Sequence, residues 1–251
     1  MSSDDEHISG EGRPVRIGIL TPSSNTVLEP YTARLLEPLF PNVSAHYARF
    51  RVTKIALDEA ANQQFGLAPI LAAADLLADA HCDVIAWNGT SASWLGFDTD
   101  RTLCAEITAR TGIKATSAIL GFNSILEKLS VRKLGLVTPY TADVQERIIG
   151  NYEAQGIEII GEQHSGLTDN FSFATVSEEA IKDMCLRTAA AKPDAIAIVC
   201  TNARGAFTAQ ALEDRLGIPV LDSVSFTLWA CLDALNVPMA RLSKFGSMFS
   251  L

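Results

Sequence analysis

An internal duplication constrains this fold more than any other feature of the sequence. The segment Arg16–Glu29 (RIGILTPSSNTVLE) matches Lys133–Glu146 (KLGLVTPYTADVQE): each has an apolar stretch, Thr-Pro, a polar turn and Val-x-Glu. Two more pairs follow in the same order, Asp83–Ser91 with Asp194–Asn202 and Arg110–Ile119 with Arg215–Val224. The spacing between partners shrinks along the chain, as connecting loops of unequal length would produce. A chain repeated in this way is expected to fold into two similar units.

Each repeat is predicted to alternate strands with helices. Short apolar runs, typical of buried parallel strands, occupy residues 15–20, 43–50, 83–88, 114–119, 133–138, 157–161, 195–199 and 219–222. Helical patterns occupy residues 27–36, 65–80, 98–111, 142–155, 177–190 and 203–216, and residues 122–129 and 225–235 are expected to close the two units. Asp98 is expected to cap the third of these helices and Gly112 to end it. This order predicts an α/β fold with two pseudo-symmetric lobes, each a parallel four-stranded sheet flanked by helices.

The length of 251 residues suits two units of roughly 100–150 residues. We expect the first lobe to comprise residues 15–120 plus 224–251, and the second lobe residues 121–223. Residues 1–14 are polar and are expected to form a disordered tail. They lack the apolar segment of a signal peptide. No apolar run in the sequence approaches the roughly 20 residues that cross a bilayer, so a cytoplasmic protein without a membrane partner is expected.

Charge and cysteine content exclude several classes of partner. The net charge of −9 argues against nucleic acid, which needs a basic surface. It is compatible with a small anion, which a few backbone N–H groups can bind locally. The five cysteines are odd in number and lack CxxC spacing. The lack of CxxC spacing excludes a zinc ribbon, and together with the odd number of cysteines it argues against a disulfide framework. The sequence leaves the oligomeric state open, a homo-oligomer included.

Polar segments follow four of the predicted strands. They are Pro22-Ser23-Ser24-Asn25, Gly89-Thr90-Ser91, Pro139-Tyr140-Thr141 and Cys200-Thr201-Asn202. Ligands of open parallel sheets bind beyond the carboxyl ends of the strands. Two similar lobes that face each other would therefore bring these segments to one cleft, which is the predicted active site. Each segment precedes a predicted helix, so together they would form a lining that binds oxyanions.

Cys200 is the expected proton-handling residue. A thiol between a strand end and a helix start is expected to have a lowered pKa, although a free cysteine often serves as a small buried hydrophobe. The equivalent position in the first repeat is Gly89, so the site would offer one thiol and one bare glycine. Trp87, on the preceding strand, is interpreted as a core residue. The other cysteines are interpreted as structural: Cys82, Cys104, Cys185 and Cys231.

At these residues the chain resembles the Asp/Glu racemase superfamily, and within it the branch of arylmalonate decarboxylases and maleate cis-trans isomerases. The resemblance covers Val15 to Asp233. Racemases of this superfamily use one strand-end cysteine from each lobe. Arylmalonate decarboxylases are similar but keep only the second, with Gly-Thr-Ser in place of the first. Gly89-Thr90-Ser91 and Cys200 match that arrangement.

The resemblance implies a chemistry that needs no metal or organic cofactor. Thr90, Ser91 and Tyr140 would form a dioxyanion hole, helped by the backbone N–H groups of Cys200 and Thr201. A malonate-type diacid would lose CO₂, the hole would hold the enediolate, and Cys200 would protonate it on one face.

Two segments resemble the maleate isomerases instead. The Pro22-Ser-Ser-Asn-Thr26 loop is similar to theirs, in which the asparagine binds a substrate carboxylate, and so is Cys200-Thr-Asn202. This resemblance implies a small, polar diacid. The expected substrate-binding residues are Pro22, Ser23, Asn25, Thr201 and Asn202.

Three functions therefore remain open from the sequence. The leading hypothesis is decarboxylation of a small malonate-like acid. The first alternative is isomerisation or racemisation, although the isomerases use the first cysteine as nucleophile and Gly89 removes it. The second alternative is a non-catalytic protein that binds a small carboxylate. If the lobes are symmetric, Gly89→Cys is expected to introduce racemase activity.

Overall fold

The computed structural model describes residues 13–59 and 63–251 and contains two four-stranded sheets. The first consists of β1 (Val15–Pro22), β2 (Val43–Phe50), β3 (Val84–Trp87) and β4 (Lys114–Ser117). The second consists of β5 (Lys133–Thr138), β6 (Glu158–His164), β7 (Ala195–Ile198) and β8 (Val220–Asp222). Their orders are β2-β1-β3-β4 and β6-β5-β7-β8, and all neighbouring strands are parallel. The two orders are equivalent, so the predicted duplicated α/β fold is confirmed.

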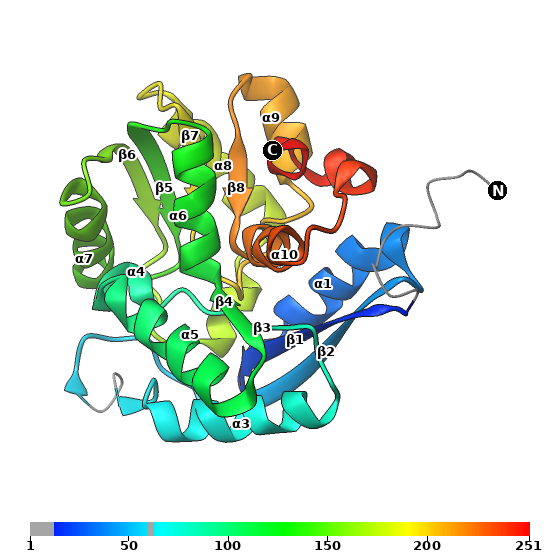
Figure 1. Cartoon of the computed structure of the whole chain (residues 1–251). Helices are drawn as coiled ribbons and strands as arrows, with labels where there is room; N and C mark the ends of the chain where they lie inside the picture. Colours follow the sequence, from blue (N-terminus) through cyan, green and yellow to red (C-terminus); the bar gives the residue numbers. More distant parts are fainter. Residues whose placement is uncertain (1–12, 60–62) are drawn as a thin grey trace.

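Helices connect and cover the strands (Figure 1). In the first half they are α1 (Leu28–Leu36), α3 (Leu67–Asp79), α4 (Ala92–Leu95), α5 (Asp98–Thr111) and α6 (Ala118–Lys128). In the second half they are α7 (Ala142–Glu153), α8 (Glu178–Ala189), α9 (Ala209–Leu216) and α10 (Ser223–Ala234). Short 3-10 helices occupy Glu37–Leu39, Phe171–Thr175, Ala240–Phe245 and Ser247–Ser250. Of the predicted tail, residues 1–12 lie outside the described residues, and Arg13 forms an ion pair with Asp83.

Two local predictions were wrong. The helix expected from residue 203 begins only at Ala209, and turns occupy residues 201–208. At Gly205 the backbone passes so close to the buried Asp222 carboxylate that an added Cβ would overlap it, a tertiary contact that the local pattern does not reveal. Asp98 does not cap α5: Phe97 is the N-cap residue, and Asp98 pairs with Arg101 on the exposed surface. Gly112 ends α5 in the left-handed conformation, as predicted.

The helices α6 and α10 pack directly against each other in the centre of the molecule (Figure 1). The rings of Phe122 and Phe226 stack with centroids 4.8 Å apart. A Cβ built on Gly121 of α6 would lie 2.5 Å from the Cβ of Ala230 of α10, so the close approach requires glycine. Because α10 also contacts β3, β4 and β8, it joins the two sheets. The exact lobe boundaries stay a prediction.

This close approach predicts opposite effects for one substitution at two helical glycines. Gly121→Ala is expected to lower the free energy of unfolding by about 1–3 kcal/mol, because α10 must move away. Gly150→Ala is the matched control, because nothing lies within 4 Å of a Cβ built on Gly150 of α7. That change is expected to raise the free energy of unfolding by about 0.4–1 kcal/mol. Urea denaturation measures both, and equal effects would contradict the packing.

Among the residues that the structure describes, no helix combines the length and apolar character that spanning a membrane requires.

Candidate active site

Polar segments from both lobes meet at the carboxyl ends of the central strands. Asn25, which follows β1, donates from Nδ2 to Oγ1 of Thr201, 3.2 Å away. The Thr201 hydroxyl in turn donates to the backbone oxygen of Asn88, also at 3.2 Å. All three residues are buried. The segments after β1, β3 and β7, which the sequence predicted to share one site, are therefore brought together.

A second set of contacts joins Thr90, Tyr140 and Cys200. The Thr90 and Tyr140 hydroxyl oxygens lie 2.7 Å apart, and Tyr140 also forms a hydrogen bond with the Cys200 side chain. The Tyr140 ring is fixed edge-on between Trp94 and Phe173, with both centroid distances 5.3 Å. Burial and the neighbouring Cys200 raise the pKa of Tyr140 well above its usual value, so its hydroxyl remains a hydrogen-bond donor at neutral pH. Three of the predicted catalytic residues thus form one cluster.

The expectation of a lowered pKa at Cys200 is wrong in this structure. Burial raises the pKa of the Cys200 thiol to about 12, although the Asn202 N–H and Tyr140 hydrogen bonds lower it. The Asn202 N–H lies 3.4 Å from the Cys200 sulfur. The predicted helix dipole is missing because α9 begins at Ala209. At neutral pH the sulfur is therefore an un-ionised thiol, a form that can donate a proton.

The predicted oxyanion role of the Cys200 backbone N–H is also contradicted. This N–H donates to Oγ of Ser223 at 2.9 Å, and Ser223 Oγ donates to the backbone oxygen of Ile198 at 2.8 Å. Ser223 thus fixes the Cys200 backbone to the end of β7. Sequence reasoning missed Ser223, which lies in the third matched segment but beyond the polar turns.

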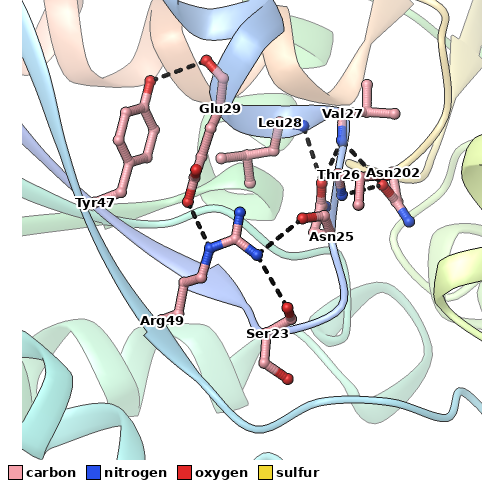
Figure 2. Close-up of polar contacts among 9 residues, drawn as sticks. All are labelled: Ser23, Asn25, Thr26, Val27, Leu28, Glu29, Tyr47, Arg49 and Asn202. Carbon is pink, nitrogen blue, oxygen red and sulfur yellow. Dashed lines mark hydrogen bonds and ion pairs between the residues drawn. The ribbon is translucent and has the colours of Figure 1, made fainter.

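Asn202 connects the two lobes through its side chain (Figure 2). Its Oδ1 accepts from the backbone N–H groups of Thr26 at 3.0 Å and Val27 at 3.2 Å. Its Nδ2 donates to the backbone oxygen of Asn170. Asn202 therefore holds the loop after β1 against the segment that follows β6, and its predicted contact with substrate stays a prediction.

The side chain of Asn25 caps the start of α1. Its Oδ1 accepts from the N–H groups of Val27 at 3.0 Å and Leu28 at 2.9 Å (Figure 2). This is the Asx-turn role of asparagine. Substrate binding by Asn25 stays a prediction, and it would use the Nδ2 group that now donates to Thr201.

Arg49 of β2 fixes the same loop and was not found from the sequence. Its Nη1 donates to the backbone oxygens of Ser23 at 2.9 Å and Asn25 at 3.1 Å, and its Nε pairs with Glu29 at 2.8 Å (Figure 2). The parallel register of β1 and β2 places Arg49 beside Thr21, so only strand pairing could have indicated that Arg49 lies near this loop. Pro22 ends β1. The Ser23 side chain is exposed and contacts the Val52 backbone, and its predicted contact with substrate stays a prediction.

Gly89 and Ser91 both lie against the indole ring of Trp87. The Trp87 Nε1 group donates to Ser91 Oγ at 3.4 Å. A Cβ built on Gly89 would overlap ring atoms of Trp87. The expectation that Gly89→Cys would introduce racemase activity stays a prediction, and it requires the indole to move, because the ring occupies the space of the added side chain.

The segment after β6 also closes on the first lobe. The Ile55 N–H donates to the Thr168 oxygen at 2.9 Å, and the Asn170 N–H donates to the Thr53 oxygen at 3.0 Å. The Asn170 side chain donates to Ser24 at 2.8 Å. These contacts identify residues 168–170 as a connection between the lobes beside the site.

Asp222 is a buried acid that the sequence analysis did not assign to the site. Its Oδ1 caps α10 by accepting from the N–H groups of Val224 and Ser225, while its Oδ2 is buried without a hydrogen-bond partner. Burial raises the pKa of Asp222 to about 7, against the hydrogen bonds from α10 that lower it. Within residues 13–59 and 63–251, no three His, Cys, Asp or Glu side chains gather closely enough to hold a metal ion.

The Asp222 pKa predicts a stability that depends on pH. Between about pH 4 and 7 the folded carboxyl keeps a proton that the unfolded chain has released, so the free energy of unfolding falls as pH rises. Asp222→Asn keeps the cap and removes the titration. The free energy of unfolding of Asp222→Asn, relative to that of the parent, is expected to rise by about 1 kcal/mol or more from pH 5 to pH 8. Urea denaturation of both proteins at pH 5 and pH 8 tests this. A difference in unfolding free energy between the two proteins that is the same at both pH values would contradict it.

Hydroxyl and amide groups and one thiol from two equivalent lobes meet at the strand ends. This arrangement is that of a duplicated α/β protein of the Asp/Glu racemase type. The family model described as arylmalonate decarboxylase matches residues 28–248. The chain belongs to this family.

Known relatives carry two different names. A maleate isomerase from Geobacillus stearothermophilus is 24% identical over 94% of this chain and 97% of its own length. An arylmalonate decarboxylase from Bordetella bronchiseptica is 27% identical over 66% of this chain and 70% of its own length. The fold matches that of a Nocardia farcinica maleate cis-trans isomerase mutant with a covalently bound succinylcysteine intermediate. Its TM-score is 0.82 at 23% identity, over 94% of this chain and 98% of that one. These relatives support catalysis by this chain, and the choice of reaction rests on the site.

Proposed function

We propose that this protein is a cofactor-independent decarboxylase of a small malonate-type dicarboxylate. One observation carries the proposal: the Cys200 thiol has no counterpart in the first lobe, where the equivalent residue is Gly89. Tyr140 connects that thiol to Thr90 through hydrogen bonds. The site thus pairs one proton donor with a set of hydroxyl groups suited to an anion.

The proposed reaction breaks one carbon–carbon bond and forms one carbon–hydrogen bond. The bond from the α-carbon to one carboxylate breaks, CO₂ leaves, and the electron pair stays on the substrate as an enediolate. Thr90, Tyr140 and Ser91 stabilise the enediolate oxygens by hydrogen bonds, which are strong in a buried site. The Cys200 S–H then donates its proton to the α-carbon. The thiolate takes up a proton from solvent, so each turnover consumes one proton.

The protonation state of Cys200 supports the acid role over a nucleophilic role. A pKa of about 12 keeps the thiol un-ionised at neutral pH, whereas attack on a double bond requires the thiolate. The isomerase alternative rests on the similarity to a maleate isomerase over 94% of this chain. An isomerase of that kind would use a cysteine in the first lobe as its nucleophile, and this chain has Gly89 at that position.

The two reactions are separated by their products. Malonate, methylmalonate, hydroxymalonate and phenylmalonate are incubated with the protein, and released CO₂ is measured together with the monocarboxylate. Maleate is incubated in parallel, and fumarate is followed by proton NMR. The proposal expects CO₂ from at least one malonate and no fumarate. Fumarate without CO₂ would replace it with the isomerase alternative.

A further inference from the structure

Strand register identifies the residues of the two lobes that correspond to each other beside the site. Leu20 of β1 pairs with Trp87 of β3. Its repeat equivalent in β5 is Val137, which pairs with Ile198 of β7. Trp87 and Ile198 therefore occupy the same position in the two lobes. Two residues further along the chain lie Gly89 and Cys200.

The two lobes fill the same space in different ways. Gly89 and Cys200 follow the last residues of β3 and β7 by two positions, the spacing at which side chains of an extended chain project to the same side. In the second lobe the pair is Ile198 and Cys200, a medium-sized side chain followed by a thiol. In the first lobe it is Trp87 and Gly89, and the nearest atoms to a Cβ built on Gly89 are Cζ2, Cη2 and Cε2 of the Trp87 ring. The indole thus takes the space of the side chain that Gly89 lacks.

The indole is held firmly in this position. Trp87 is 1% exposed. Its ring centroid lies 5.1 Å from that of Phe50 and 6.3 Å from that of Phe65. Its Nε1 donates to Ser91 Oγ, one of the expected oxyanion-binding groups. The ring is therefore part of the wall behind the Gly89-Thr90-Ser91 turn.

We propose that Trp87 is a specificity-determining residue, whose indole excludes a second proton carrier from the first lobe and so confines protonation of the substrate to the Cys200 face. This inference rests on the proposed function, whose enediolate must be protonated. An indole ring exchanges no proton with an α-carbon at neutral pH. A thiol at position 89 would do so, one thiolate removing the α-proton on its face while the other thiol donates on the opposite face.

Three variants test, without measuring activity, whether the Trp87 indole excludes a side chain at position 89. They are Gly89→Cys, Trp87→Ile, and both together, which copies Ile198 and Cys200 into the first lobe. Gly89→Cys alone is expected to lower Tm by roughly 5 °C or more through overpacking. Trp87→Ile alone lowers Tm by leaving a cavity. The double variant is expected to be more stable than Gly89→Cys, so the two effects are not additive.

One outcome of this comparison would overturn the proposal directly. A cavity of about 430 Å³, lined by Trp87, Phe65 and Ser91 among others, lies next to the indole. If the ring simply moved into it, Gly89→Cys would keep the parent Tm. That result would show that Trp87 does not exclude a side chain at position 89. A double variant no more stable than Gly89→Cys would have the same consequence.

A second readout tests the consequence for proton transfer. Each protein is incubated with phenylacetate or propionate in D₂O, and deuterium at the α-carbon is followed by proton NMR. With one thiol, at most one of the two α-hydrogens exchanges. The double variant is expected to exchange both, while Gly89→Cys alone is expected to exchange no second α-hydrogen.

The two proposals fail in different ways. If the parent releases CO₂ from none of the four malonates, the proposed function fails, while the Tm comparison still decides whether the indole excludes a side chain. If the parent decarboxylates but the double variant exchanges only one α-hydrogen, the role of Trp87 is overturned and the function stands. Exchange of both hydrogens by Gly89→Cys alone would also overturn it.

Discussion

Replacing Cys200 by serine is expected to lower kcat for CO₂ release by about 10²–10⁴-fold, the usual contribution of a general acid. Serine keeps a hydrogen-bonding atom next to Tyr140 and Asn202, so the surrounding contacts have a partner. Its hydroxyl is a much weaker acid than a thiol and delivers a proton poorly. Because the Cys200 pKa is about 12, the parent's acid is fully protonated between pH 6 and 9. Titration of Cys200 is therefore expected to cause no fall in parent activity across that range.

Cys82→Ala is the matched control for this prediction. Cys82 precedes β3 at the amino end of the first sheet, whereas Cys200 follows β7 at the carboxyl end of the second, and burial raises the pKa of Cys82 to about 11. Losing this sulfur is expected to leave kcat unchanged. Full turnover in Cys200→Ser, with a Tm near that of the parent, would remove the thiol from the mechanism. Absence of turnover in the parent, with ligand-dependent stabilisation kept in Cys200→Ala, would favour the non-catalytic binding protein.

The duplicated fold was predictable because its signal is local and repeated. The matched segments begin β1 and β5 and end β3 and β7, so equivalent residues had to lie at equivalent strand ends. This reasoning placed Thr90, Tyr140 and Cys200 at one site, and they form one hydrogen-bonded cluster. The meeting of Asn25 with Thr201 follows from the same logic, because both are buried at strand ends.

The wrong predictions depend on contacts between distant residues. The acidity of Cys200 was predicted from a helix start that α9 does not provide, and burial raises the pKa of the thiol instead. The Cys200 N–H was assigned to the oxyanion before Ser223 was known to accept it. The Trp87 indole filling the space beside Gly89 depends on a side-chain direction that no spacing rule specifies. In each case the packing of the folded chain, which the local pattern does not specify, decided the outcome.

The different surroundings of Cys200 and Gly89 explain why this site is asymmetric. On the second lobe, Asn202 and Tyr140 form hydrogen bonds with the thiol, and Ser223 fixes the Cys200 backbone. On the first lobe, the equivalent position meets an aromatic ring. One face of a bound anion would thus contact an acid and the other a wall without exchangeable protons. Such an arrangement suits a single protonation better than a reversible transfer between two faces.

Tyr140→Phe is expected to lower kcat by about 10²–10³-fold, the usual effect of removing one oxyanion-hole donor. The hydroxyl is buried and already oriented by Thr90 at 2.7 Å, so it needs no reorganisation when charge develops on the enediolate. The phenyl ring keeps its packing against Trp94 and Phe173. KM is expected to change less than kcat, because the bond strengthens as the negative charge forms. Thr90 loses its partner, which costs about 1–3 kcal/mol of unfolding free energy.

Tyr152→Phe separates this catalytic effect from the loss of stability. Tyr152 is also fully buried, and its hydroxyl donates to Asn123 at 3.2 Å, away from the site. Both variants therefore remove one buried hydroxyl that forms side-chain hydrogen bonds, to Thr90 and Cys200 at Tyr140 and to Asn123 at Tyr152. The two are expected to lose similar stability in urea denaturation, and only Tyr140→Phe loses kcat. Equal losses of kcat would mean that Tyr140 acts through packing, and that the anion is held by other groups. A selective loss of kcat would assign charge stabilisation to the hydroxyl that connects Thr90 with Cys200.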